Sequence, residues 1–88
     1  MTYAIYILYS EKDHRLYVGH TNNLSERIYR HNAGFVSATQ NRRPLVCIHS
    51  EMFATRSEAM KRELFLKSLW GARIKKKILK KYLEEFQA

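Results

Sequence analysis

A strand, a turn and a helix follow one another within residues 16–31, and this arrangement constrains the fold more than any other feature of the sequence. The first residues of this stretch favour a strand, and Gly19 lets the backbone turn or be approached closely. Asn23, followed three positions later by Glu26, is a capping-box pattern. We therefore expect a short strand that passes almost at once into a helix over about residues 24–32.

The packing face of this predicted helix carries two cationic side chains. Leu24, Arg27, Ile28 and His31 recur at i, i+3, i+4 and i+7 and so share one stripe. Arg27 could lay its stem on the core and lift its head into water, with His31 a satisfied histidine at the helix end. Alternatively, both side chains point with Tyr17 into a shallow site for an anionic group.

The charge of the chain favours a polyanionic partner. The 88 residues include 16 Lys and Arg against 8 Asp and Glu, which gives a net charge of +8 and a pI near 9.9. Residues 56–82 hold ten of the cations and only two Glu. A basic flank of this kind indicates nucleic acid before any motif is considered.

Length and cysteine content narrow the class further. We expect residues 1–88 to form a single domain, because 88 residues support one modest core. We see no apolar run long enough to span a bilayer and no signal peptide, so we predict a cytoplasmic protein that contacts no membrane. Cys47 is the one cysteine and lies in an apolar run, so we interpret it as a small buried hydrophobe.

The remaining chain predicts two more strands and two more helices. Residues 3–9 are dense in strand formers on both faces, which is typical of a central strand, and residues 45–53 form a third strand. Residues 15–18 should pair with the first strand in an antiparallel hairpin. Its register stays open, and a slip of one residue would put Tyr6 and Tyr17 on opposite faces. We expect helices over about residues 56–69 and 72–86.

Several charged residues on these later elements have two interpretations. Glu63 is the one carboxylate on a predicted inner stripe with Ala59, Met60, Leu64 and Lys67, and acids rarely occupy such a face unpaired. It either pairs with Lys67 at i, i+4 or binds a metal ion in the cavity that Arg27 faces. Two further groups are open in the same way. The loop arginines Arg42 and Arg43 either hold phosphates or are solvated, and the lysine face of residues 75–81 is solvated or contacts a polyanion. His49 is interpreted as structural.

Taken together, the motifs resemble the GIY-YIG nuclease family, and in particular its small stand-alone bacterial members. The resemblance is carried by Ala4-Ile5-Tyr6, Tyr17-Val18-Gly19, Arg27, His31-Asn32, Asn41 to Pro44 and Glu58 to Glu63. It covers nearly the whole chain. Ala4 replaces the glycine of the first motif, and no late asparagine follows Asn41, a role that Lys67 is a candidate to fill. The resemblance implies an α/β fold, with a small three-stranded antiparallel sheet flanked by helices.

The resemblance also implies roles for individual residues. Tyr17 would be the general base or would activate water jointly with a metal ion, and Tyr6 would orient the phosphate or the water. Arg27 would stabilise the developing phosphoryl charge, and Glu63 would be the only protein ligand of one Mg²⁺ or Mn²⁺ ion. His31 would share proton transfer. We add a set of expected nucleic-acid contacts: His20, Arg42, Arg43, Lys67, Lys76, Lys77 and Lys80.

Two functions follow from these residues. The first is a metal-dependent endonuclease, a hydrolase that cuts phosphodiester bonds in DNA, including branched or damaged DNA in repair or processing, with RNA left open as a substrate. The second is a non-catalytic nucleic-acid-binding module that keeps the fold and the basic surface. The carboxylate at Glu63 favours the first function. A module selected only for binding needs cations but no carboxylate among them. We expect a monomer that uses no small-molecule cofactor.

Overall fold

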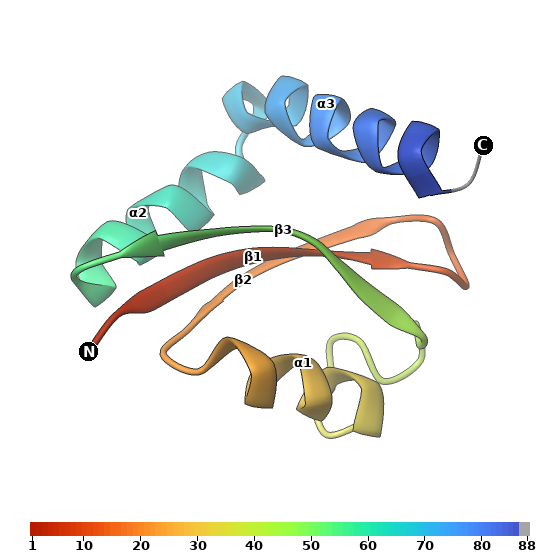
Figure 1. The fold of residues 1–88 in the computed structure, drawn as a ribbon, viewed down its shortest axis with the longest axis horizontal. Coiled ribbons are helices and arrows are strands. Elements are labelled where there is room, and N and C mark those ends of the chain that lie inside the picture. The colour runs from red at the N-terminus through yellow and green to blue at the C-terminus, as the bar shows by residue number, and fades with distance from the viewer. Residues whose placement is uncertain (87–88) are drawn as a thin grey trace.

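A three-stranded antiparallel sheet is the middle layer of the computed structural model, which describes residues 1–86 (Figure 1). The strands are β1 (Tyr3–Ser10), β2 (Leu16–Thr21) and β3 (Leu45–Phe53), in the spatial order β2-β1-β3. β1 is central, as its two apolar faces predicted, and every residue from Ala4 to Ser10 is buried.

Helices cover both faces of this sheet. α1 (Leu24–Ala33) lies below it in Figure 1, while α2 (Arg56–Lys67) and α3 (Leu69–Phe86) lie above it. This arrangement confirms the expected small three-stranded antiparallel sheet flanked by helices. Among the described residues, no helix is both long and apolar enough to cross a bilayer.

The register of the first hairpin places both candidate tyrosines on one face. Tyr6 stands opposite Gly19, and Leu8 stands opposite Tyr17. Because alternate residues of a strand share a face, Tyr6 and Tyr17 both face α1. The expected strand end at Val18 is wrong, since β2 continues through Gly19 to Thr21. Gly19 serves close approach here, because a Cβ atom at this position would lie 2.5 Å from Tyr6 Oη.

Two hydrophobic clusters lie on the two sides of the sheet. Ile5, Ile7 and Val18 pack with Ala59 and Leu66 of α2. On the other side, Tyr6, Leu8 and Leu45 pack with Tyr17, Leu24, Ile28 and Cys47. Cys47 is half-buried there, whereas we expected it to be a small buried hydrophobe.

The predicted inner stripe of α2 needs correction. Ala59 and Leu66 are its buried residues, whereas Met60 and Leu64 are 44% and 65% exposed. The stripe that faces the sheet therefore runs along positions 59, 63 and 66. Glu63 stays on this inner side and is half-buried.

α3 begins three residues earlier than expected, at Leu69. Ser68 alone separates it from α2, because Gly71 packs directly on the α2 backbone: a Cβ there would lie 2.4 Å from the Phe65 carbonyl oxygen. Ile74 and Ile78 pack on the core. Phe86, the last residue of the helix, is 70% exposed.

Local interactions fix α1 against the sheet. Asn23 is its N-cap, as predicted, and accepts a hydrogen bond from the Glu26 amide, while Gly34 ends the helix in the left-handed region at φ 88°. The Asn32 side chain donates to the Leu45 carbonyl at 2.9 Å and accepts from the Leu45 amide at 2.8 Å. α1 is thereby tied to β3 at the end that carries His31.

Candidate active site

Two tyrosines, an arginine and a histidine meet between the sheet and α1. Tyr6 comes from β1 and Tyr17 from β2, with their ring centroids 6.3 Å apart. His31 of α1 lies edge-on to both rings, at 5.6 Å from Tyr6 and 5.0 Å from Tyr17. Arg27, one turn earlier on α1, points its Nε at Tyr6 Oη at 3.4 Å. The predicted helical stripe that contains Arg27 and His31 thus faces these two phenols.

A chain of hydrogen bonds runs through this cluster. Arg27 donates to Tyr6 Oη, which lies 2.9 Å from His31 Nε2. His31 Nδ1 lies 2.7 Å from Thr39 Oγ1, and Thr39 Oγ1 in turn donates to the Val36 carbonyl. One proton assignment satisfies every contact: Tyr6 donates to Nε2, and the Nδ1–H of a neutral His31 donates to Thr39.

Burial decides the protonation state of His31. Its side chain is fully buried, and burial, assisted by the neighbouring Arg27 charge, lowers the pKa of His31 to about 4. His31 is therefore neutral near pH 7. A buried imidazole with a partner on each ring nitrogen fits the interpretation of His31 as a satisfied histidine at the helix end, and proton transfer by His31 stays a prediction. In this structure, His31 Nε2 accepts a hydrogen bond from the Tyr6 hydroxyl.

The low pKa of His31 predicts a stability that falls in mild acid. The unfolded chain takes up a proton near pH 6.5, whereas the folded chain resists until about pH 4. The free energy of unfolding should therefore drop by roughly 2 kcal/mol between about pH 7 and pH 5. Denaturant unfolding at each pH measures this loss, and in His31→Gln this contribution should vanish. An NMR titration that gives His31 a pKa near 6.5 would contradict the assignment.

Thr39 is a site residue that sequence reasoning missed. It lies in the loop between α1 and β3 and is fully buried, although its neighbours Ala38 and Gln40 are exposed. No periodicity marks it, because its burial depends on the turn formed by the Thr39 amide and the Val36 carbonyl. Its hydroxyl fixes the His31 tautomer, and through His31 the orientation of the Tyr6 hydroxyl.

The pKa of Tyr6 is shifted the other way. Burial raises the pKa of this phenol, and the hydrogen bond from Arg27 opposes the shift without cancelling it. The Glu63 carboxylate is close enough to contribute to raising that pKa. Tyr6 therefore stays protonated at neutral pH and is suited to orient a ligand by its hydroxyl.

Glu63 forms a second cluster at the β2 edge, on the α2 side of the sheet. His20, which stands opposite Ile5 in the ladder, places Nδ1 2.7 Å from Glu63 Oε1. Lys67 Nζ donates to Glu63 Oε2 at 2.8 Å. Burial tends to raise the pKa of Glu63, but the hydrogen bonds from Lys67 and His20 outweigh it, and the net shift is downward. Glu63 is an ionised carboxylate, and the predicted pair with Lys67 forms.

The donor set at Glu63 fits a divalent cation of the Mg²⁺ type. Within residues 1–86, no group of three or more His, Cys, Asp or Glu side chains could form a metal cage. Mg²⁺ does not need one, since it keeps several waters and binds through one or two carboxylates and the substrate phosphate. Glu63 is ionised, and the Lys67 side chain, 48% exposed, can leave its second oxygen free.

The predicted nucleic-acid contacts lie in different places. His20 and Lys67 join the Glu63 cluster. Arg42 is half-buried and paired within the chain, because its Nε donates to Asp13 Oδ2 at 2.6 Å and its guanidinium also reaches the Leu16 carbonyl. This hydrogen bond lowers the pKa of Asp13 to about 2. Arg43 is exposed beside Gly34.

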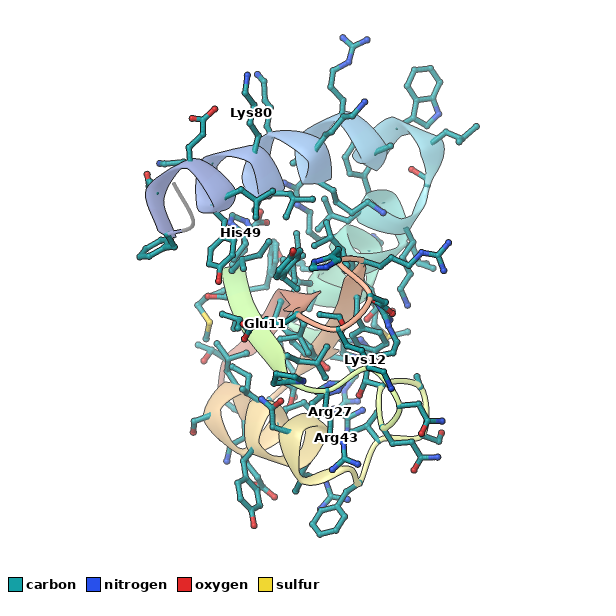
Figure 2. All side chains as sticks on the ribbon, turned by 90° about the vertical axis from the view of Figure 1, so that its right-hand side faces the viewer. Glu11, Lys12, Arg27, Arg43, His49 and Lys80 are labelled. Atoms are coloured by element: carbon teal, nitrogen blue, oxygen red, sulfur yellow. The ribbon has the colours of Figure 1, made fainter. Side chains whose placement is uncertain are left out.

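The lysines of α3 lie far from the tyrosines. Figure 2 shows Lys80 on the outer side of α3 and Arg27 in the layer of α1, with the sheet between them. Lys76 and Lys77 are exposed on the same helix. His49 pairs with Glu51, which Arg62 also contacts, so its structural interpretation fits its surroundings.

Comparisons with known proteins identify related chains. A family model described as the GIY-YIG catalytic domain matches residues 2–78. A UPF0213 protein of Staphylococcus haemolyticus is 48% identical over 58 residues, which are 65% of this chain and 71% of that protein. The UPF0213 protein YazA of Bacillus subtilis is 41% identical over 75 residues, which are 84% of this chain and 71% of that protein.

A solved structure has the same fold. The solution NMR structure of a UPF0213 protein from Bacillus halodurans superposes with a TM-score of 0.54 at 29% sequence identity. The match covers 89% of this chain and 83% of that one.

Proposed function

Because this chain belongs to the GIY-YIG family, we propose that it is a metal-dependent endonuclease that hydrolyses phosphodiester bonds in DNA. The observation that carries the proposal is the meeting of Tyr6, Tyr17 and Arg27 on one side of β2, with an ionised Glu63 at the edge of the same strand. A module that only binds nucleic acid has no need of a half-buried carboxylate within its cations.

Tyr17 is the proposed general base. Unlike Tyr6, it is only half-buried, so water can reach it. Arg27 lies close enough to both phenols for each to raise the pKa of its guanidinium, so its positive charge stands beside the proposed base. The attacking water gives its proton to Tyr17 as the new bond to phosphorus forms.

Arg27 and Tyr6 hold the phosphate in this scheme. The guanidinium faces the non-bridging oxygens, where negative charge increases as the water attacks. The Tyr6 hydroxyl, held by His31 and Thr39, orients the phosphate or the water. The bond from phosphorus to the 3′ oxygen breaks, and that oxygen takes a proton from solvent, which leaves a 3′-hydroxyl and a 5′-phosphate.

Glu63 would hold the divalent ion, Mg²⁺ or Mn²⁺, with His20 as a positioning residue that orients its carboxylate. Such an ion supplies charge stabilisation at the leaving oxygen. We place the activity in repair or processing of structured DNA by a cytoplasmic monomer, and Lys76, Lys77 and Lys80 would add long-range attraction for the phosphate backbone.

One observation favours the non-catalytic alternative. Both oxygens of Glu63 already have partners, His20 Nδ1 and Lys67 Nζ. If this ion cluster stays closed when DNA binds, the domain binds without cutting.

A nicking assay separates the two functions. Purified protein is mixed with supercoiled, linear and branched DNA in Mg²⁺, in Mn²⁺ and in a chelator. We expect nicks only with metal, and ends that a ligase can reseal, because the proposed break leaves a 3′-hydroxyl and a 5′-phosphate. DNA binding without cleavage in either metal would support the binding module.

A further inference from the structure

The junction of α2 and α3 exposes two large apolar side chains that neither the sheet nor α1 covers. Leu69 is 93% exposed and Trp70 is 82% exposed. We call these two residues the elbow. A tryptophan displayed in this way is costly in water, and such exposure on a small protein commonly marks an interaction site.

The elbow is held rigidly. Gly71 packs so closely on the backbone of Phe65 and Leu66 that no other residue fits without a shift. Ser68 accepts a hydrogen bond from the Gly71 amide on its carbonyl oxygen, while its own hydroxyl donates to the Phe65 carbonyl. The backbone of Trp70 is thus fixed by the first turn of a packed helix, so binding does not have to order it.

All charged residues in the stretch of chain around the elbow are cationic. Residues 64–83 contain no Asp or Glu and seven Lys or Arg. Arg73 lines a recess of about 540 Å³ with Leu69 and Trp70. A second recess of about 550 Å³ shares Leu69 and Arg73 and extends to Leu16, the residue before Tyr17. The elbow therefore opens toward the strand that carries the proposed general base.

We propose that Trp70, supported by Leu69, stacks on an unpaired base of the nucleic acid, while Arg73 and Lys76 contact the flanking phosphates. This inference rests on the proposed function for its ligand class. A flat exposed aromatic ring within a field of cations is the combination that single-stranded nucleic acid requires, since every base has a stacking face and every nucleotide a charge.

Other occupants fit less well. A second copy of the chain would bring two cationic surfaces together, which is repulsive. An anionic membrane would need a broad apolar face, but Ile74 and Ile78 of α3 are used in the core, and Tyr82 packs on Tyr9. At the elbow, only the side chains of Leu69 and Trp70 would be available to insert into a bilayer, and two side chains do not make a broad apolar face.

The single tryptophan of the chain makes this proposal directly measurable. With selective excitation of tryptophan, the full chain is titrated in a chelator with a single-stranded oligonucleotide, with the paired duplex of the same sequence, and with vesicles of anionic lipid. We expect strong quenching by the single strand and weak quenching by the duplex. Quenching by vesicles alone, or equal quenching by both DNAs, would overturn the proposal.

Substitutions separate this site from the hydrolytic one. With labelled oligonucleotide in chelator, Trp70→Ala should weaken single-strand binding by about 5- to 150-fold, the value of one stacked base. Trp70→Phe should restore most of the affinity. Leu64→Ala, which truncates another exposed leucine of this region (65% exposed), is the matched control and should bind normally.

The two proposals can fail separately. If Trp70→Ala binds the single strand as tightly as the wild type while the protein still nicks DNA with metal, the stacking site is wrong and the nuclease stands. If Trp70→Ala loses single-strand affinity but the wild type never cuts, the stacking site stands and the catalytic proposal fails.

Discussion

Tyr17→Phe should lower the single-turnover rate of DNA cleavage by roughly 10²- to 10⁴-fold, the range typical of a general acid–base group. The substitution removes one hydroxyl and almost no volume. Tyr17 packs by its ring against His31 and Tyr6, and these contacts survive in phenylalanine. The free energy of unfolding and the affinity for DNA should therefore stay close to those of the wild type.

Tyr29→Phe is the matched control for this experiment. Tyr29 lies on α1 between Arg27 and His31 but is 66% exposed on its outer side, so loss of its hydroxyl should leave the rate unchanged. Arg27→Ala should reduce turnover with a smaller loss of binding, because its charge matters most when the phosphoryl group is most negative. If Tyr17→Phe cuts at the wild-type rate, its phenol is structural.

Glu63→Gln should abolish cleavage while DNA affinity changes little, because the basic surface remains. The amide cannot replace the charge that a divalent ion requires. A second measurement is independent of activity: Mn²⁺ should raise the melting temperature of the wild type, since a ligand that binds only the folded state stabilises it. This increase should be lost in Glu63→Gln.

Glu84→Gln is the control for charge alone. Glu84 is an exposed residue on α3 whose contact is a 4.0 Å pair with Lys80, so its loss should affect neither cleavage nor the response to Mn²⁺. Unchanged cleavage in Glu63→Gln would exclude Glu63 as the metal ligand. It would also leave the His20–Glu63–Lys67 cluster as a structural ion network.

Much of the fold could be predicted because local signals and global packing agree. The cap at Asn23 stands where its side chain suggested, and β3 spans the predicted residues 45–53. The doubly apolar β1 is the central strand, as its composition requires. Each of these features depends on residues that are neighbours in the sequence, so a sequence pattern can predict it.

What failed depended on contacts that join distant segments. Sequence cannot indicate that Gly19 belongs to the strand, because glycine is needed there for the Tyr6 hydroxyl, which leaves no room for a Cβ atom. The buried face of α2 was misassigned because Met60 and Leu64 share the helical period with Ala59, and only the packing on the sheet decides between them. The early start of α3 arises from the contact of Gly71 with α2.

The candidate site shows the same division. Tyr6, Tyr17, Arg27 and Glu63 could be named from motif spacing, but the partners that set their chemistry could not. Thr39 reaches His31 from a loop eight positions later, and His20 reaches Glu63 across 43 positions. These two contacts set the tautomer of His31 and the orientation of the Glu63 carboxylate, and residue spacing indicates neither of them.

A double-mutant cycle of Tyr17→Phe and Arg27→Ala tests most directly whether these side chains act on one phosphate. Single-turnover cleavage rates are measured for the wild type, both single variants and the double variant, with saturating DNA and Mg²⁺. Arg27 and Tyr17 lie close together and are proposed to act on the same phosphate, so the loss of one side chain weakens the contribution of the other. The double variant should therefore be slower than the slower single variant by no more than about tenfold. Losses that multiply in full would show that the two groups act independently, which would contradict a shared site.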